Sequence, residues 1–281
     1  MRSFRWFVLI ISSSVAFLSA LAQTPQAPPA NRIDKVKDDL YVISGDGGNT
    51  TVFVTDEGLV LVDDKFDRDY DDILAKIKTV SDKPVKYIFN THPHPDHTGG
   101  NQKFPPSVII IGHTNNPVGM ARRKAPAPPT VTFSEEMAIT LGGKQVLARH
   151  TGNGHTDADL MVYFPSDKVL AAGDLFNTGT FGVYIDYAGG GSLLPWPKTL
   201  EGFLKWDFDT VVPGHGPLAT RADFIKSRAD VESTITRITG MVREGKTKED
   251  VTKVLIGEFG WNPAGLGIRN SVEGLMAELK K

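Results

Sequence analysis

The chain has 281 residues, of which 31 are lysine or arginine and 33 are aspartate or glutamate, so its formal charge of −2 disfavours nucleic acid as the main partner. With 40% hydrophobic and 23% charged residues, the composition is that of a globular protein and excludes a largely disordered chain. The absence of cysteine excludes disulfides, thiolate nucleophiles and metal sites that depend on sulfur, so any metal site must use carboxylates and the seven histidines.

The N-terminus has the pattern of a secretory signal peptide. Two arginines precede an apolar stretch from Trp6 to Ala22, which ends in the small residues typical of a cleavage site. We predict cleavage after Ala22, so that residues 1–22 are a signal peptide and the mature protein is periplasmic or secreted, with no stable membrane anchor. The alternative is an uncleaved anchor, but an apolar run of about 17 residues is at the lower limit for spanning a bilayer.

A proline-rich segment follows the signal peptide. Residues 23–32 contain the run QTPQAPPAN, which predicts an extended tether rather than packed structure. Residues 33–281 are long enough to form one domain, especially one of the layered α/β type. Because the signal peptide carries two arginines and no acid, the mature chain would have 29 basic and 33 acidic residues and be more acidic than the precursor.

The first half of the folded part predicts an antiparallel meander, one helix and two buried strands. Short β-rich runs are separated by glycine-containing turns, of which the turn at 45–49 is either a plain hairpin or a flap over a site. The helix is predicted because Ile73, Leu74, Ile77 and Val80 lie on one face. The predicted strands are 40–44, 51–55, 59–62, 85–89 and 108–111, and the helix is 67–80.

The second half predicts a further group of strands followed by helices. A surface loop at 125–130 leads into the strands, and three helices close the chain, of which the first carries apolar residues at helical spacing. This order suggests two αβ halves that stack sheet on sheet. The predicted strands are 137–141, 145–148, 160–164, 169–172 and 210–212, and the first of the closing helices is 221–243.

The strand at 85–89 runs into the densest group of potential metal ligands in the chain. The residues from 92 to 97 read His92-x-His94-x-Asp96-His97. In an extended segment, residues two apart point to the same side, so His92 and His94 can bind one metal, and Asp96 and His97 on the following turn can bind a second. The alternative, a polar surface loop, does not require three histidines so close together.

Three more candidate ligands lie beside predicted strands. His155 lies in a glycine-rich turn before a strand, and Asp174 and His215 each directly follow one. Loops at strand ends are where protein scaffolds usually carry functional groups. Together with the group at 92–97, these residues would hold two divalent ions. A set of histidine and aspartate ligands suits Zn²⁺, with Fe or Mn as alternatives.

The remaining histidines and three aromatic residues have less specific patterns. We assign His113 a structural or supporting role, because the other candidates already complete the ligand set. His150 competes with His155 as a ligand, and the Gly-His-Thr context favours His155. Three aromatic residues beyond Asp174 either line a substrate pocket or pack in the interior: Tyr184, Tyr187 and Trp196.

The seven candidate ligands, together with the glycines that flank them, resemble the motifs of the metallo-β-lactamase superfamily. The resemblance spans about residues 33–220 and implies an α/β fold, the four-layer αββα sandwich of two mixed β-sheets with helices on the outer faces. It also implies a dinuclear metal site at the edge of the two sheets. The motifs, in the order of that family, are His92-x-His94-x-Asp96-His97, Gly154-His155-Thr156, Gly173-Asp174 and Pro213-Gly214-His215-Gly216.

The resemblance also implies a role for each candidate ligand. The best-known β-lactamases of the superfamily carry a cysteine at the position of Asp174 and, three residues later, a lysine that grips the substrate carboxylate. This chain has Asp174 and Asn177 there, which removes the most specific support for β-lactam substrates without excluding them. By this resemblance, His92, His94 and His155 would bind the first metal, and Asp96, His97 and His215 would bind the second. Asp174 would bridge the two metals, as in lactonases and glyoxalase II-like enzymes.

From these ligands we expect an exported hydrolase with two Zn²⁺ ions. A metal-bridging hydroxide would attack the carbonyl of a small-molecule substrate, either a cyclic amide or ester of the β-lactam or lactone type or a thioester. Asp96 would be the catalytic side chain that holds the second metal and orients the hydroxide, and the leaving group would be protonated either by Asp96 or by a metal-bound water. Two other classes stay open: a mono-iron oxidoreductase of the same fold that oxidises sulfur compounds, and a non-catalytic periplasmic metal-binding protein.

Overall fold

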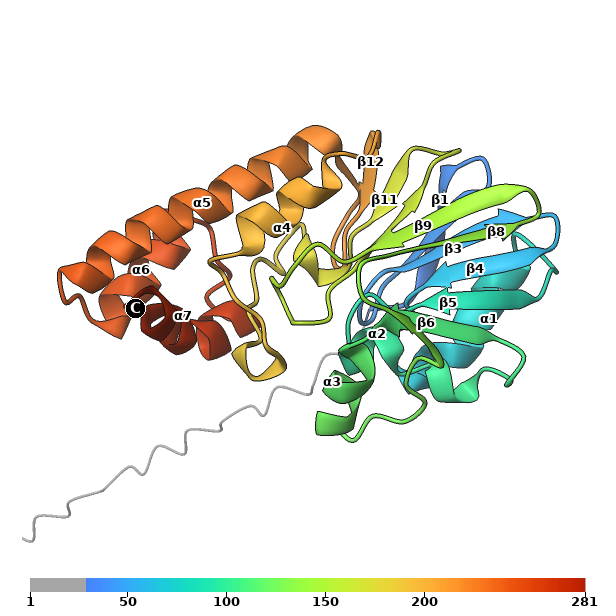
Figure 1. Cartoon of the computed structure of the whole chain (residues 1–281), viewed down its shortest axis with the longest axis horizontal. Helices are drawn as coiled ribbons and strands as arrows, with labels where there is room; N and C mark the ends of the chain where they lie inside the picture. Colours follow the sequence, from blue (N-terminus) through green and yellow to red (C-terminus); the bar gives the residue numbers. More distant parts are fainter. Residues whose placement is uncertain (1–28, 281) are drawn as a thin grey trace, which may run out of the picture.

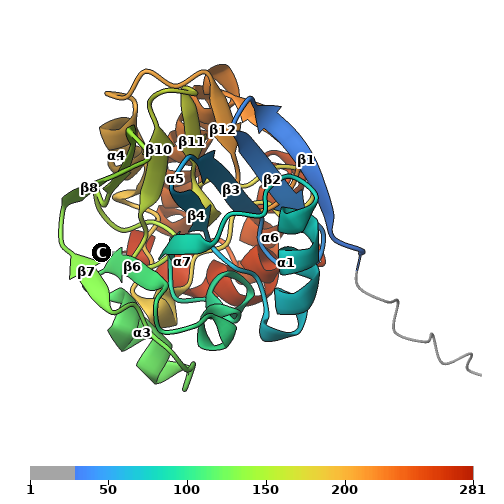
Figure 2. The same cartoon turned by 90° about the vertical axis from the view of Figure 1, so that its right-hand side faces the viewer.

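Two β-sheets pack face to face, and helices cover both outer faces of the pair (Figures 1 and 2). The computed structural model describes residues 29–280. The chain completes the first sheet before it enters the second, and the longest helix, near the C-terminus, lies on the outer face of the second sheet (Figure 1). This arrangement confirms the predicted four-layer αββα sandwich of two mixed sheets.

The first sheet has seven strands whose spatial order follows the chain. Strands β1 to β4 are antiparallel because short turns join them, and β4 to β7 are parallel because longer connections return the chain to the same edge. The strands are β1 (Arg32–Lys37), β2 (Leu40–Ser44), β3 (Thr50–Thr55), β4 (Gly58–Val62), β5 (Val85–Phe89), β6 (Ile109–His113) and β7 (Val131–Phe133).

The second sheet has six strands in the order β13-β12-β11-β10-β9-β8. Neighbouring strands are antiparallel except for β11 and β12, which are parallel because their connection contains a helix. The strands are β8 (Glu136–Leu141), β9 (Lys144–Arg149), β10 (Met161–Phe164), β11 (Val169–Ala171), β12 (Thr210–Val212) and β13 (Ala219–Thr220).

The helices fall into a short set that follows the strands of the first sheet and a longer set at the C-terminal end. The α-helices are α1 (Tyr70–Lys78), α2 (Pro95–Thr98), α3 (Asn116–Arg122), α4 (Trp196–Phe203), α5 (Arg221–Arg243), α6 (Lys248–Gly257) and α7 (Val272–Leu279). The 3₁₀ helices are η1 (Asp67–Asp69), η2 (Asn101–Lys103), η3 (Gly173–Leu175) and η4 (Tyr187–Gly189), and a π-helix, η5, spans Gly267–Ser271.

Three apolar cores separate the four layers. Phe53 and Phe164 pack between the two sheets with ring centroids 4.8 Å apart. Ile73 and Ile77 of α1 are buried against the outer face of the first sheet, as their helical spacing predicted. Helices α4 to α7 pack on the second sheet through a larger cluster that includes Phe224. The long strand-end loops therefore project from a rigid, doubly covered scaffold.

The predicted elements agree with the structure where the apolar pattern is strong. Strands β2, β5 and β12 and helix α5 have the predicted bounds. Strand β1 was missed because it is an edge strand with mostly polar, exposed side chains, which leaves no apolar alternation to detect. Helix α4 was missed because it is short and is stabilised by burying Trp196, Leu200 and Phe203 rather than by helix-forming residues.

The predicted signal peptide and most of the predicted tether lie outside residues 29–280. The end of the tether differs from the expectation, because Asn31 is buried and its Nδ2 donates to Asp69 Oδ1 at 2.9 Å. Packed structure therefore begins before residue 33. Within the described part of the chain, no helix has the length and apolar character required to cross a bilayer.

Candidate metal centre

The fold brings all seven predicted ligand side chains together at one edge of the sandwich. They come from the loop after β5 and the start of α2, the loop before β10, η3 after β11, and the loop after β12. One group comprises His92, His94, His155 and Asp174, and a second comprises Asp96, His97 and His215; within each group the ligand atoms lie within 4.8 Å of one another.

The four ligand atoms of the first group lie around a common centre. His94 Nδ1 lies 3.1 Å from His92 Nε2 and 2.9 Å from His155 Nε2. Asp174 Oδ2 completes the group at 4.0 Å from His92 Nε2 and 3.6 Å from His155 Nε2. Four ligand atoms placed tetrahedrally about 2.0–2.1 Å from one zinc ion are separated from one another by about 3.3 Å. The spacing therefore fits one divalent ion.

The second group lies on the other side of Asp174. His97 Nε2 and His215 Nε2 are 3.3 Å apart, and Asp96 Oδ2 lies 3.2 Å from His215 Nε2 and 3.7 Å from His97 Nε2. Asp174 Oδ1 is 3.3 Å from His97 Nε2 and 3.4 Å from His215 Nε2. One carboxylate therefore faces both groups, with one oxygen directed to each.

The donor set is arranged for cations rather than for hydrogen bonds within the protein. Asp174 Oδ1 is buried and has no hydrogen-bond partner among the described residues. Ring nitrogens of His92, His94 and His155 also face one another in the interior. Buried acceptors that lack donors are costly, and cations between the groups would satisfy them. The residues present therefore fit two divalent ions.

The pKa directions agree with this arrangement. Burial lowers the pKa of His92 well below its usual value and that of His155 to about 4, which keeps both rings neutral as metal binding requires. In the second group, burial alone would lower the pKa of His97, but the carboxylates of Asp174 and Asp96 outweigh it and raise the pKa well above normal. Negative charge therefore dominates around His97.

Hydrogen bonds to the other ring nitrogen orient two of the histidines. His97 Nδ1 donates to Asp63 Oδ2 at 2.7 Å, and His155 Nδ1 donates to the Tyr184 carbonyl at 2.8 Å. In the neutral ring that metal binding requires, each contact leaves Nε2 without a proton and directed into the site. Asp63 is itself fixed, since it accepts hydrogen bonds from the main chain and hydroxyl of Thr91 at 2.8 and 2.7 Å.

His94 is oriented through Nε2 rather than through Nδ1. Its Nε2 lies 2.9 Å from Asp186 Oδ2, which leaves Nδ1 for the first group. Arg123, directly after α3, pairs with the same Asp186 oxygen. Burial alone would raise the pKa of Asp186, but His94 and Arg123 outweigh burial and lower it to about 2. Sequence reasoning did not assign Asp63, Asp186 or Arg123 to the site: the two acids belong to no distinctive motif, and the basic run Arg122-Arg123-Lys124 is more typical of a solvated surface.

The sequence of the chain matches a known family over this region. The family model described as "Metallo-beta-lactamase superfamily" matches residues 43–215, which include all seven ligand candidates. The chain belongs to the metallo-β-lactamase superfamily. Superfamily membership and the His/Asp clusters together support a metal-dependent hydrolase that binds divalent metal ions.

Several curated proteins are similar to the chain. Metallo-beta-lactamase IND-1 of Chryseobacterium indologenes is 26% identical over 76% of this chain and 91% of its own length. A type 2 metallo-beta-lactamase of Bacillus cereus is 26% identical over 66% of this chain and 74% of its own length. The 2,4-dinitroanisole O-demethylase subunit alpha of a Nocardioides strain is 31% identical, over 50% of this chain and 44% of that protein.

Solved structures of other proteins share the fold. A metallo-beta-lactamase from Pontibacter korlensis superposes with a TM-score of 0.64 at 23% identity, over 72% of this chain and 99% of that one. A double mutant of the sec-alkyl sulfatase PisA1 superposes with a TM-score of 0.69 at 15% identity, over 89% of this chain and 49% of that one.

The turn at 45–49 of this superfamily member packs directly on the metal-binding groups. Gly48 N donates to the Asp96 carbonyl at 3.1 Å, and Lys65, which is fully buried, donates from Nζ to the Gly48 carbonyl at 2.6 Å. A Cβ at Gly48 would lie 2.2 Å from Cε1 of His97. The turn is therefore a fixed cover over the His97 ring, and only glycine fits at its closest point.

The remaining histidines lie outside both groups. His113 and His150 stack on each other with centroids 3.9 Å apart, and His150 Nδ1 donates to the Asp159 carbonyl at 2.7 Å. Of the three aromatic residues, Trp196 is buried in the core, and Tyr187 donates to Glu278 Oε2 at 2.7 Å. Tyr184 stacks on His94 at 5.9 Å and so borders the site.

Solvent reaches the site most at Asp96, and to a smaller extent at His215 and at His94, whose side chain is 11% exposed. The side chains of Asp96 and His215 are 23% and 12% exposed, whereas those of His97 and Asp174 are 0% and 2% exposed. His215 also lies in the wall of two cavities, of about 670 and 400 Å³. These volumes are in the range of small-molecule binding sites, so substrate has room beside His215.

We predict that Asp63→Asn weakens metal binding by about 10- to 100-fold, the usual effect of losing a carboxylate that orients a histidine ligand. The amide carries no negative charge and can present its NH₂ group to His97 Nδ1, which disfavours the required tautomer. Metal titration monitored by equilibrium dialysis measures the effect. Asp82→Asn, at an exposed site, is the matched control, and equal affinities of the two variants would contradict the assigned role of Asp63.

Proposed function

We propose that the protein is an exported dinuclear zinc hydrolase that cleaves an activated carbonyl compound. The substrate class is a cyclic amide or ester of the β-lactam or lactone type, or a thioester. His92, His94 and His155 would hold one ion, Asp96, His97 and His215 the other, and Asp174 would bridge them. The N-terminal pattern supports export, and N-terminal sequencing of the mature protein tests cleavage after Ala22.

The observation that carries the proposal is the position of the Asp174 carboxylate. Its two oxygens face the two groups separately, at 3.6 Å from His155 Nε2 and at 3.3 Å from His97 Nε2. A single-ion site would leave one of these oxygens buried without a partner. A bridging carboxylate also holds two ions at a fixed separation, which is the arrangement that dinuclear hydrolases use.

When bound, two zinc ions would supply a water of lowered pKa as nucleophile and a Lewis acid that polarises the carbonyl. The side chain available for proton transfer is Asp96. Burial alone would raise its pKa, but His97 and His215 outweigh burial and hold the pKa at about 2, so Asp96 is a carboxylate at neutral pH. As the most exposed of the seven candidates, it can accept a proton from the nucleophile and return it to the leaving group.

The relatives support hydrolysis but favour no single substrate. Their names include β-lactamases, an O-demethylase and a sec-alkyl sulfatase, so the same fold serves different bonds. In this chain Asn177 Oδ1 accepts a hydrogen bond from His215 N at 2.8 Å, and its Nδ2 lies 3.4 Å from the Asp174 carbonyl. Asn177 therefore supports the site from within and provides no positive charge for a substrate.

Removal of metal is expected to abolish turnover, and restoring zinc is expected to recover it. We would measure metal content by mass spectrometry and assay a panel of chromogenic β-lactams, lactones and thioesters with chelated and zinc-loaded protein. Two zinc ions per chain and zinc-dependent turnover support the proposal. One redox-active iron per chain would instead identify an oxidoreductase, and tight metal binding without turnover on the panel would identify a metal-binding protein.

A further inference from the structure

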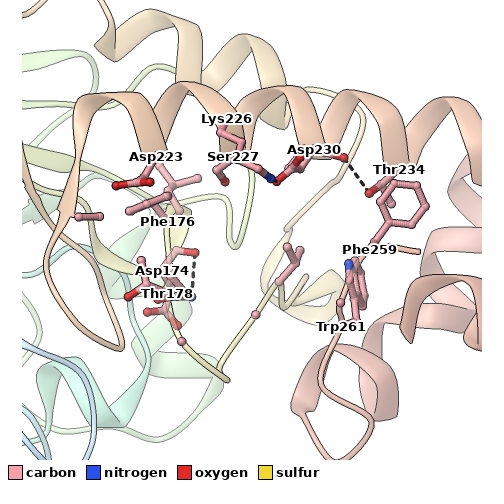
Figure 3. Close-up of a pocket in the computed structure, with 18 of the residues that line it drawn as sticks. Asp174, Phe176, Thr178, Asp223, Lys226, Ser227, Asp230, Thr234, Phe259 and Trp261 are labelled. Carbon is pink, nitrogen blue, oxygen red and sulfur yellow. Dashed lines mark hydrogen bonds and ion pairs between the residues drawn. The ribbon is translucent and has the colours of Figure 1, made fainter. Parts of the chain in front are cut away.

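Three cavities border the metal centre, and they differ in the charges on their walls. The largest, of about 670 Å³, includes Arg32 and Asp34, which pair with each other at 2.8 Å. A second, of about 490 Å³, lies between α5 and the loop after Asp174 (Figure 3). Its lysine, Lys226, pairs with Asp230 of the same helix at 2.5 Å. Neither cavity therefore offers a cation that lacks a partner.

The third cavity, of about 400 Å³, does offer one. Its walls include His215 and Arg269, and no acidic residue lines it. Arg269 is exposed and forms no ion pair within residues 29–280, because the acid one turn further along, Glu273, pairs with Lys248 at 3.5 Å. The same cavity therefore contains a proposed metal ligand and a free guanidinium group.

Buried contacts at both ends of the π-helix η5 fix the backbone that carries Arg269. Ser271 is fully buried, and its hydroxyl donates to the Ile185 carbonyl and accepts from the Ile185 amide, both at 3.0 Å. At the other end of η5, a Cβ at Gly267 would lie 2.0 Å from the Val183 carbonyl, so the backbones touch. π-helices are rare and often occur at functional sites, where they redirect a side chain.

The segment that holds η5 is the same one that orients the first metal group. Between Val183 and Asp186, the Tyr184 carbonyl accepts from His155 Nδ1 at 2.8 Å, and the Asp186 carboxylate contacts His94 Nε2 at 2.9 Å. Arg269 is thus coupled through short, buried contacts to the loop that supports the metal centre, although it lies beyond the region that the family model matches.

We propose that Arg269 binds an anionic group of the substrate, so that the enzyme selects acyl compounds that carry a carboxylate or another oxyanion apart from the bond that is cleaved. This inference rests on the proposed hydrolase function. A guanidinium group matches such anions with two parallel hydrogen bonds, and partial enclosure in a cavity strengthens the attraction. Phe181, whose ring stacks on His215 at 3.8 Å, provides an apolar wall for the part of the substrate between the anion and the carbonyl.

The kinetic test compares two chromogenic esters of equal chain length, the mono-4-nitrophenyl ester of glutaric acid and 4-nitrophenyl valerate. We expect Arg269→Ala to lower the ratio of kcat/KM for the anionic ester to that for the neutral ester by about 10-fold or more. Arg269→Lys keeps the charge but not the paired hydrogen bonds, so its ratio should be intermediate. Arg243→Ala, at an exposed site at the end of α5, is the control and should leave the ratio unchanged.

A binding measurement keeps the inference independent of turnover. Calorimetric titration of the zinc-loaded protein with glutarate should give a Kd about 10-fold or more higher for Arg269→Ala than for the wild type. If the wild type hydrolyses neither ester, linear aryl esters are not substrates, the substrate panel of the preceding subsection decides the hydrolase proposal, and the titration alone decides the role of Arg269. If the wild type hydrolyses the esters and Arg269→Ala leaves the ratio unchanged, the anion site is wrong and the hydrolase proposal stands.

Discussion

His94→Ala is expected to abolish turnover while leaving the fold largely intact. His94 Nδ1 lies within 3.1 Å of both His92 Nε2 and His155 Nε2, so it is central to the first group. Lowering the pKa of water from about 15.7 to about 7 corresponds to roughly 12 kcal/mol, and a general base alone typically contributes only about 3–5 kcal/mol. Loss of the first ion therefore cannot be compensated by the remaining side chains. Activity assays and metal analysis of the purified variant measure the effect.

Circular dichroism separates a lost site from a lost fold. His94 lies in a loop, and the apolar cores do not include it, so the spectrum of His94→Ala should match that of the wild type. His150→Ala, which removes a histidine outside both groups, is the matched control and should retain metal and activity. Unchanged turnover in His94→Ala would refute the assigned site.

Asp174→Asn is expected to weaken the binding of both ions, so that bound metal falls from two ions per chain to one or fewer, and to lower turnover by about 10³-fold or more. The substitution keeps the shape of the side chain but removes the negative charge that both groups share. In the absence of metal, burial alone would raise the pKa of Asp174, but His215 and His97 outweigh burial and hold it well below normal, so the wild-type group is ionised. An amide can offer one oxygen and no charge, which cannot serve two cations.

The stoichiometry of Asp174→Asn distinguishes bridging from simple ligation. Equilibrium dialysis followed by mass spectrometry counts the ions, and Asp38→Asn, whose side chain is 99% exposed, is the control. A variant that still binds two ions with wild-type affinity would show that Asp174 is not shared. Loss of one ion with the other unaffected would place Asp174 in a single group.

The metal-binding groups could be recognised early because their signals are local. The His92–His97 motif has four potential ligands in six residues, and the spacing alone places pairs of side chains on one side of the chain. Asp174 and His215 directly follow apolar runs, and such runs end at a sheet edge. The local residue types and the strand periodicity are therefore sufficient to identify these residues as candidate metal ligands.

The residues that orient the ligands could not be recognised in this way. Asp63 is 34 residues from His97, and Asp186 is 92 residues from His94, and neither belongs to a motif. Many exposed acids in the chain have the same local pattern. What distinguishes these two is burial beside a particular ring nitrogen, and that depends on how the two sheets pack.

The amino-acid sequence by itself determined the chemistry available to this protein: imidazole and carboxylate ligands, no thiol, and strands whose apolar faces must stack. The tertiary structure decided how that chemistry is used. It divided the ligands into two groups around Asp174, placed Gly48 over His97, and brought Arg269 from the C-terminal end to a cavity beside His215. The physical reason is that side-chain type and strand periodicity are encoded over a few residues, whereas juxtaposition across the chain follows only from burying the apolar faces of both sheets and of the helices that cover them.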